Sequence, residues 1–196
     1  MENKMIKNQK RIEELLTELL GYMDPNPSRE GLKETPHRVW KYYNEILEAQ
    51  WMTNDEIAAD PRFNKCFDAN RNDSLVVEKD IAISSMCEHH LAPMYDMKVA
   101  VGYIPRGKVI GLSKIARVAE FCGKRLQLQE KIGADIADVM SKILNTHDVV
   151  VVIEGKHSCM TSRGVKARES ITRTAYLSGA FRDNFQLREE FYNLIK

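Results

Sequence analysis

Residues 75–105 read LVVEKDIAISSMCEHHLAPMYDMKVAVGYIP, and the apolar spacing in this stretch indicates the fold class. Apolar and polar residues alternate over 75–84 and again over 97–105. A period of two is typical of strands that bury one face. Pro105 ends the second strand, because proline has no N–H to donate to a sheet. The stretch therefore predicts two strands separated by a turn that is rich in cysteine and histidine.

The residues that follow predict further strands and helices. Arg106-Gly107 is a turn signal, and it predicts a hairpin into a strand over 108–112. Ser113 is a good N-cap for a helix that ends near Gly123. Further elements are expected as a helix over 128–144, strands over 148–154 and 169–181, and a helix from Asn184. This order predicts an α+β domain, with an antiparallel sheet and helices packed on one face.

The first third of the chain has a helical pattern instead. Apolar residues recur at i, i+3, i+4 and i+7 over 10–21, which predicts an amphipathic helix. The pair Thr35-Pro36 predicts a second helix start, with Thr35 as the N-cap. Residues 52–73 are polar and interrupted, and they predict a long loop with room for one helical turn. We expect an N-terminal helical segment and loop over 1–73 and a second domain over 74–196.

Composition excludes several classes of protein. The net charge is +1, so binding of nucleic acid through bulk charge is not expected. No apolar run approaches the length of a membrane span, and the N-terminal MENKMIKNQK lacks the apolar core of a secretory signal. The 4 cysteines are scattered, which favours reduced thiols over a disulfide framework. The sequence therefore predicts a cytoplasmic protein with no membrane partner.

Two clusters carry metal-binding residue types. Cys87-Glu88-His89-His90 places a thiol and an imidazole on one turn, and His157-Ser158-Cys159 lies about seventy residues later. Two thiolates and one imidazole suit Zn²⁺, and three protein ligands with one open position are the catalytic pattern. A structural site would need a fourth ligand, and Cys66 and Cys122 stand alone. The plainer alternative is a buried cysteine beside surface histidines.

A second group of residues is basic and polar. Ser113, Lys114 and Arg117 occupy the first turns of a predicted helix, where backbone N–H groups favour an anion. Arg163 follows Cys159 closely and brings a cation near the metal cluster. Arg38 is unremarkable by itself. The residues alone favour a capped helix with solvated cations over a phosphate site.

Gln129 and Glu130 open the long predicted helix. An acid in a first helical turn usually complements the helix dipole. A carboxylate can also accept from two adjacent N–H donors, such as those on the edge of guanine. The residues alone favour the first interpretation.

Several motifs together resemble one known family. They are ETPHRV near the N-terminus, SSMCEHHLAP, VIGLSKIARV, LQLQEKI, EGKHSCMTSRGV and FRDNFQLREEFYNLI. In this order they are similar to GTP cyclohydrolase I, and the resemblance runs from about Glu30 to the C-terminus. The combination of CEHH, GLSK, QE and H-x-C followed by RGV is highly specific.

The resemblance implies a fold, a reaction and a set of roles. The family forms a T-fold, here residues 74–196, and assembles as a homodecamer with active sites between subunits. It converts GTP and water to 7,8-dihydroneopterin triphosphate and formate. The implied ligands of zinc are Cys87, His90 and Cys159, and the implied proton-transfer residues are His89 and His157. For substrate binding, the resemblance implies Glu130 at the guanine edge, with Gln129 beside it. At the triphosphate or ribose it implies Ser113, Lys114, Arg117 and Arg163. Arg38 would reach the triphosphate in a neighbouring subunit's site.

One stretch departs from the family pattern. The family usually reads CEHHLVPFxGxVHIAYIP, whereas here Met94 replaces the Phe, the Gly is missing and one residue is added before Tyr103. The departure over Met94–Val99 leaves open a partial cyclohydrolase that stops at a ring-opened or formylated intermediate. A purine-nucleotide-binding scaffold with structural zinc and a different T-fold enzyme are further alternatives.

Overall fold

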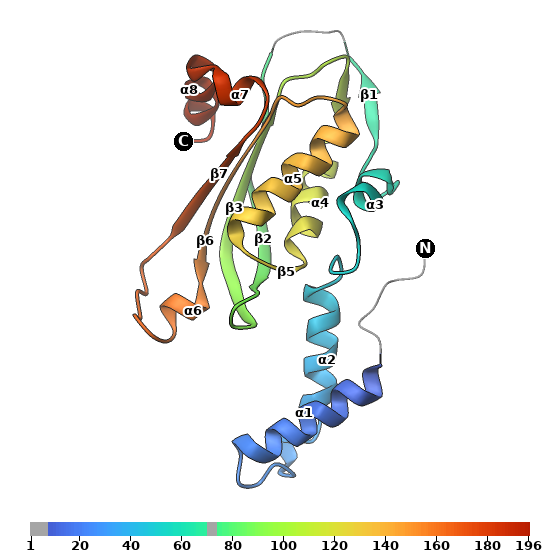
Figure 1. Cartoon of the computed structure of the whole chain (residues 1–196), viewed down its shortest axis with the longest axis vertical. Coiled ribbons are helices and arrows are strands. Elements are labelled where there is room, and N and C mark those ends of the chain that lie inside the picture. The colour runs from blue at the N-terminus through green and yellow to red at the C-terminus, as the bar shows by residue number, and fades with distance from the viewer. Residues whose placement is uncertain (1–7, 70–73) are drawn as a thin grey trace.

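The computed structural model describes residues 8–69 and 74–196. The predicted absence of a secretory signal, and the last four residues of the predicted loop over 52–73, lie outside the described residues. In Figure 1 a twisted sheet forms the body, and two N-terminal helices extend below it. No helix in the described ranges is long and apolar enough to cross a membrane.

The helices and strands interleave along the chain. The helices are α1 (Gln9–Met23), η1 (Glu30–Leu32), α2 (Thr35–Ile46), α3 (Asn54–Ala59), α4 (Leu112–Gly123), α5 (Gln129–Leu144), α6 (Ser158–Thr161), α7 (Ala180–Asp183) and α8 (Phe185–Leu194). The strands are β1 (Cys66–Asp68), β2 (Val76–Cys87), β3 (Ala92–Tyr103), β4 (Lys108–Ile110), β5 (Leu126–Gln127), β6 (Val149–His157) and β7 (Thr172–Leu177).

Five strands form the main sheet in the order β5-β2-β3-β6-β7. Neighbours from β2 to β7 are antiparallel, and only the short β5 pairs in parallel, with the end of β2. β1 and β4 form a separate two-stranded sheet. This mixed, mainly antiparallel arrangement with its N-terminal helices agrees with the predicted α+β T-fold.

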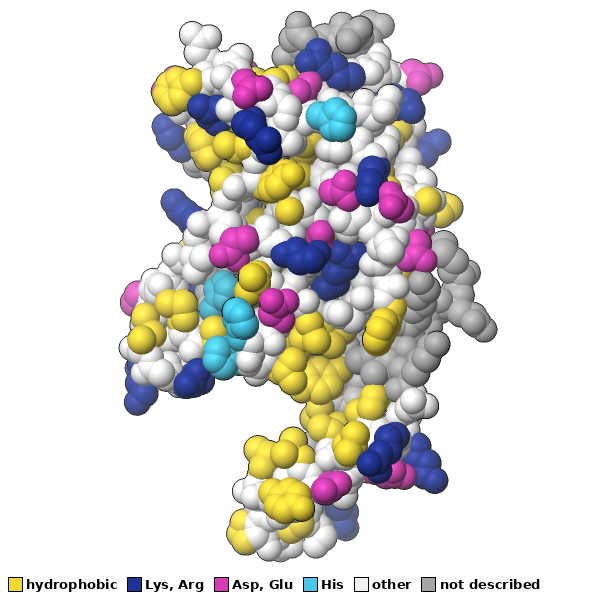
Figure 2. All heavy atoms as spheres, in the orientation of Figure 1, with side chains coloured by type: hydrophobic (Ala, Val, Ile, Leu, Met, Phe, Trp, Pro, Cys, Tyr) yellow, Lys and Arg dark blue, Asp and Glu magenta, His cyan; other side chains and the backbone are white. Residues whose placement is uncertain are grey.

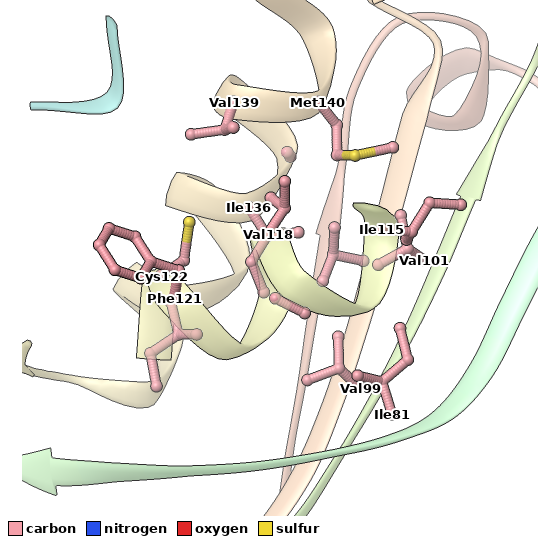
Figure 3. Packing of buried hydrophobic residues seen from close by; sticks show 14 of the residues in the cluster. Ile81, Val99, Val101, Ile115, Val118, Phe121, Cys122, Ile136, Val139 and Met140 are labelled. Carbon is pink, nitrogen blue, oxygen red and sulfur yellow. The ribbon is translucent and has the colours of Figure 1, made fainter. Parts of the chain in front are cut away.

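The main core lies between the sheet and the two long helices. Figure 3 shows α4 and α5 side chains packed over residues from β2 and β3. Side chains such as Val101 from the sheet, Ile115 from α4 and Ile136 from α5 are all buried. Alternation along each strand directs every second residue to this core, so α4 and α5 together cover one face of the sheet.

A smaller core lies on the opposite face, where α7 and α8 pack. Val150 points away from α5 and contacts a cluster that includes Phe181 and Phe191. Gly102 of β3 allows the close approach of α8, because a Cβ there would lie 2.7 Å from Cδ2 of Phe191. The C-terminal helix thus covers part of the face that the long helices leave open.

The predicted hairpin at Arg106-Gly107 is wrong. β4 (Lys108–Ile110) pairs with β1 (Cys66–Asp68) and not with β3. β3 already pairs with β2 on one side and β6 on the other, so neither edge is available to a third strand. The Ile110 amide instead donates to the hydroxyl of Tyr103 at 3.3 Å.

Both predicted helix caps are also wrong. Gly111 is the N-cap of α4, and Ser113 lies inside the first turn with no capping bond. Glu34 is the N-cap of α2, so Thr35 is the first helical residue. In α4 the Lys114 amide donates to the Gly111 carbonyl at 2.7 Å, which starts the helix earlier than the side-chain signal predicts.

Residues 52–69 are more ordered than a loop. A capping box between Thr53 and Glu56 starts α3, which packs on α5, and β1 follows. These contacts join this part of the N-terminal segment to the body, so the boundary at residue 73 stays a prediction.

α1 has no buried residue, and its exposed apolar side chains include Leu15, Leu19, Tyr22 and Met23. Figure 2 shows this apolar surface on the helices below the body.

Candidate active site and metal centre

Three chain segments meet at one end of the sheet. They are the turn between β2 and β3, the junction of β6 with α6, and the junction of β5 with α5 (Figure 1). Gln127 of β5 pairs with Cys87 of β2, and Met94 of β3 pairs with His157 of β6. The pairing of strands therefore brings both metal-type clusters and the start of α5 together.

Cys87, His90 and Cys159 form the only group of three metal-type ligands among the residues that the structure describes. Their ligand atoms all lie within 4.8 Å of one another. Tetrahedral ligands with Zn–S bonds of 2.3 Å are about 3.8 Å apart, so one zinc ion fits this group with little movement. Burial, and next the facing Cys87 thiol, raises the pKa of Cys159. A cation between the two sulfurs would favour the thiolates instead.

The turn that carries Cys159 is tied to β3 by two hydrogen bonds. Ser158 Oγ donates to the Pro93 carbonyl at 2.8 Å, and the hydroxyls of Tyr95 and Thr161 lie 2.9 Å apart. These contacts hold α6 over the start of β3 and so set the position of the ligand. The sequence alone does not indicate these residues, because the bonded partners are about 65 residues apart and no local motif marks them.

The departure from the family pattern is a β-bulge. Tyr95 pairs with Lys156 and Lys98 with Glu154, so β3 has one more residue than β6 between these pairs. Asp96 within the bulge has φ 50°, a left-handed conformation that favours glycine. Asp96 stands at the position of the family's usual Gly. The bulge thus accommodates the added residue, and the pairing of β3 with β6 continues on both sides of it.

Two further histidines border the ligand group. His89 Nδ1 lies 4.0 Å from Cys87 Sγ. His157 is half-buried, and its Nε2 lies 2.9 Å from Oε1 of Gln129. Burial lowers the pKa of His157, and the charge of Glu130 offsets part of this effect. Figure 2 shows histidine side chains grouped on the surface at this end of the sheet, with an acidic side chain beside them.

Arg163 and the residue pair that opens α5 complete this group. Arg163 Nη1 lies 3.1 Å from His90 Nε2. Glu130 is exposed beside His157, whereas Gln129 is buried with its side chain directed into the protein. The structure thus gathers eight of the predicted site residues: Cys87, His89, His90, Gln129, Glu130, His157, Cys159 and Arg163.

The remaining four predicted residues lie elsewhere. The C-terminal end of α4 leads into β5 and the ligand group, and Ser113 lies about 15 Å from that end along the helix axis. Lys114 Nζ donates to the Arg62 carbonyl at 2.9 Å, and Arg117 is exposed one turn further along. Arg38 is exposed in the first turn of α2, below the body.

Comparison with known proteins places the chain in a family. Residues 12–196 match the model of the GTP cyclohydrolase I family. GTP cyclohydrolase 1 of Ruminiclostridium cellulolyticum is 51% identical over 194 residues, which cover 96% of this chain and 98% of that protein. The Clostridium beijerinckii protein of the same name is 47% identical over 190 residues, 95% of this chain and 96% of its own length. A Clostridium botulinum GTP cyclohydrolase 1 is 52% identical over 178 residues, 88% of this chain and 89% of its own.

The resemblance inferred from CEHH, GLSK, QE and HSC is confirmed by these matches, which extend over nearly the whole chain. The chain belongs to the GTP cyclohydrolase I family and is an enzyme.

Proposed function

We propose that this enzyme is zinc-dependent and converts GTP and water to 7,8-dihydroneopterin triphosphate with release of formate. The observation that carries the proposal is the group of Cys87, His90 and Cys159, whose ligand atoms lie within 4.8 Å of one another. When bound there, zinc with three protein ligands supplies a Lewis acid and lowers the pKa of water.

The protein residues around this group support the proposed roles. Opening the purine at C8 requires proton transfer to and from water and the ring nitrogens. His157 and His89 border the ligand group and are the proposed proton-transfer residues. Arg163 lies beside His90 and is the proposed contact to the ribose or triphosphate in the same chain.

A direct assay tests this function against its alternatives. The protein is incubated with GTP and zinc, and formate release and pterin fluorescence are measured separately. Both signals are expected together. Formate without pterin, or loss of GTP without formate, would indicate a partial cyclohydrolase. Binding of GTP with no turnover would support a scaffold with structural zinc.

Glu130 is the proposed contact to the guanine edge. It is exposed at the start of α5, close enough to His157 to affect its pKa. A carboxylate accepts from two N–H donors, whereas the amide of a Glu130→Gln variant would turn one acceptor into a donor. A mispaired polar contact costs about 1–3 kcal/mol, so kcat/KM for GTP should fall by about 5- to 150-fold. Metal content should stay unchanged.

The control for this variant is Asp138→Asn on the same helix. Asp138 lies two turns further along α5, where it accepts from Lys142 at 2.8 Å. Steady-state rates with GTP and metal analysis are measured for both variants. Normal turnover by Glu130→Gln would mean that the guanine base is recognised elsewhere.

The site is proposed to be completed by other subunits of a homodecamer. Ser113 and Lys114 lie at the end of α4 far from the ligand group, and Arg38 lies on the helices below the body. Residues at these positions are therefore proposed to bind the triphosphate in a neighbouring subunit's site. The exposed apolar face of α1 supports the same proposal, because such faces are usually covered by a partner.

Assembly and activity should therefore be lost together. Leu19→Lys places a charge on the apolar face of α1, where full burial of a leucine side chain is worth about 1.5–3 kcal/mol. Light scattering should give about ten times 22.5 kDa for the native protein and a smaller mass for this variant, with slower GTP turnover. The adjacent Glu18→Lys is the control and should keep both. A fully active protein with a mass near 22.5 kDa would contradict the proposal.

A further inference from the structure

Both polar atoms of the Gln129 side chain make hydrogen bonds within the protein. It is 1% exposed at the first position of α5. Its Nε2 lies 3.2 Å from the Ile153 carbonyl, 3.1 Å from the Thr172 carbonyl and 3.2 Å from Thr174 Oγ1. Its Oε1 lies 2.9 Å from His157 Nε2. The amide thus connects α5, β6 and β7 with one of the site histidines.

The two carbonyls determine which way this amide points. A carbonyl oxygen only accepts hydrogen bonds, so the atom that faces Ile153 and Thr172 must be the NH₂ group. Reversing the amide would place Oε1 against two oxygens in a buried site, which is unfavourable. The backbone of β6 and β7 therefore leaves Oε1 of Gln129 as the atom that faces His157.

The orientation of the amide then determines the tautomer of the histidine. Because Oε1 accepts but cannot donate, the His157 Nε2 must carry a hydrogen. In a neutral imidazole the other nitrogen then holds the lone pair. We propose that Gln129 is a positioning residue, whose Oε1 orients the His157 ring and holds a hydrogen on Nε2, so that Nδ1 is the ring nitrogen directed away from the amide.

This role differs from a contact between the Gln129 side chain and the substrate, and it rests on the proposed function of His157. It also relates two parts of the site. Gln129 and Glu130 are consecutive, so the start of α5 sets the His157 tautomer and the position of the proposed guanine-binding carboxylate together. A shift of α5 would disturb both at once.

The tautomer can be observed directly, without GTP. The full-length protein is labelled with ¹⁵N in the histidine rings, sedimented and studied by solid-state NMR, which does not require a small particle. Protonated and lone-pair nitrogens resonate in separate ranges. Comparison with His157→Ala identifies the signals of His157 among those of the 5 histidines. We expect a protonated Nε2 in the native protein.

A matched pair of variants isolates the effect of Gln129. Gln129→Met keeps the length of the side chain and removes the acceptor. Gln127→Met is the control, because Gln127 is equally buried at 1% exposure and donates to the Cys122 carbonyl at 2.7 Å and to Ser85 Oγ. Gln129→Met should give a mixture of His157 tautomers, whereas the control should keep the Nε2–H form.

Kinetics provide the second measurement. Hydrogen-bond partners of metal-ligating histidines typically contribute about 10- to 100-fold to activity. We expect a fall of similar size in kcat for GTP in Gln129→Met, with little change in KM. A rise in KM with the tautomer unchanged would overturn the proposal and make Gln129 a substrate contact. An unprotonated Nε2 in the native protein would also overturn it. A protonated Nε2 in a protein that does not turn over GTP would support the positioning role and contradict the proposed function.

Discussion

Replacing His157 by alanine is expected to lower formate release from GTP by about 10²- to 10⁴-fold, the usual cost of losing a positioned acid–base group. His157 is the last residue of β6 and lies two residues before the proposed ligand Cys159. It borders the ligand group without belonging to it. The variant should therefore keep its zinc, its fold and its assembly while it loses the reaction.

The comparison that makes this result decisive is His147→Ala. His147 is exposed just before β6, at the opposite end of that strand, so its loss should leave turnover unchanged. Formate release, zinc content and light-scattering mass are measured for both proteins. If His157→Ala lost zinc, His157 would be a fourth ligand and the site would be closed. A structural role for the metal would then be favoured.

Two members of the ligand group could be predicted because short-range spacing carries most of the information. Cys87 and His90 lie on one turn, and a Cys-x-x-His pair needs no tertiary structure to bring both ligands together. The structure places Cys159 beside them through the pairing of β3 with β6. The residue type makes Cys159 a candidate for the third ligand in the sequence. Only the pairing of the strands shows that it lies beside Cys87 and His90.

The contacts that organise the site could not be predicted in this way. The bond between His157 and Gln129 joins residues 28 apart, and that between Tyr95 and Thr161 joins residues 66 apart. Glutamine, tyrosine and threonine occur widely in proteins, so no local pattern distinguishes these residues from ordinary core or surface positions. Their roles follow from which strands pair and in which register.

The wrong hairpin at Arg106-Gly107 has a similar cause. The turn signal was local and correct, since Gly107 has φ 91°. Whether β4 can pair with β3 depends on whether β3 has a free edge. β6, which begins about forty residues after β4, occupies that edge. Local turn chemistry thus predicted where the chain reverses but not which strand it joins.

The largest expected effect on the metal centre is that of Cys159→Ser. The native protein should bind about one zinc per chain, because the described residues hold one group of three suitable ligands. A serine hydroxyl is a poor substitute for a thiolate, and two remaining ligands do not hold zinc tightly. Since even an outer hydrogen-bond partner of a ligand contributes 10- to 100-fold to affinity, losing the ligand itself should cost more than about 100-fold.

Metal analysis after dialysis should therefore find little zinc in Cys159→Ser, and formate release should fall to background. Cys66→Ser is the matched control, because Cys66 is a free, half-buried thiol in β1 that does not belong to the group. That variant should keep its zinc. Unchanged zinc in Cys159→Ser would mean that the ligand set is wrong. Zinc loss in both variants would point to general unfolding, which a thermal denaturation curve of each protein would reveal. Loss of zinc in Cys159→Ser alone, in a protein that still unfolds cooperatively, would show that the metal binds where the end of β2 meets α6. The proposed chemistry depends on a metal at this position.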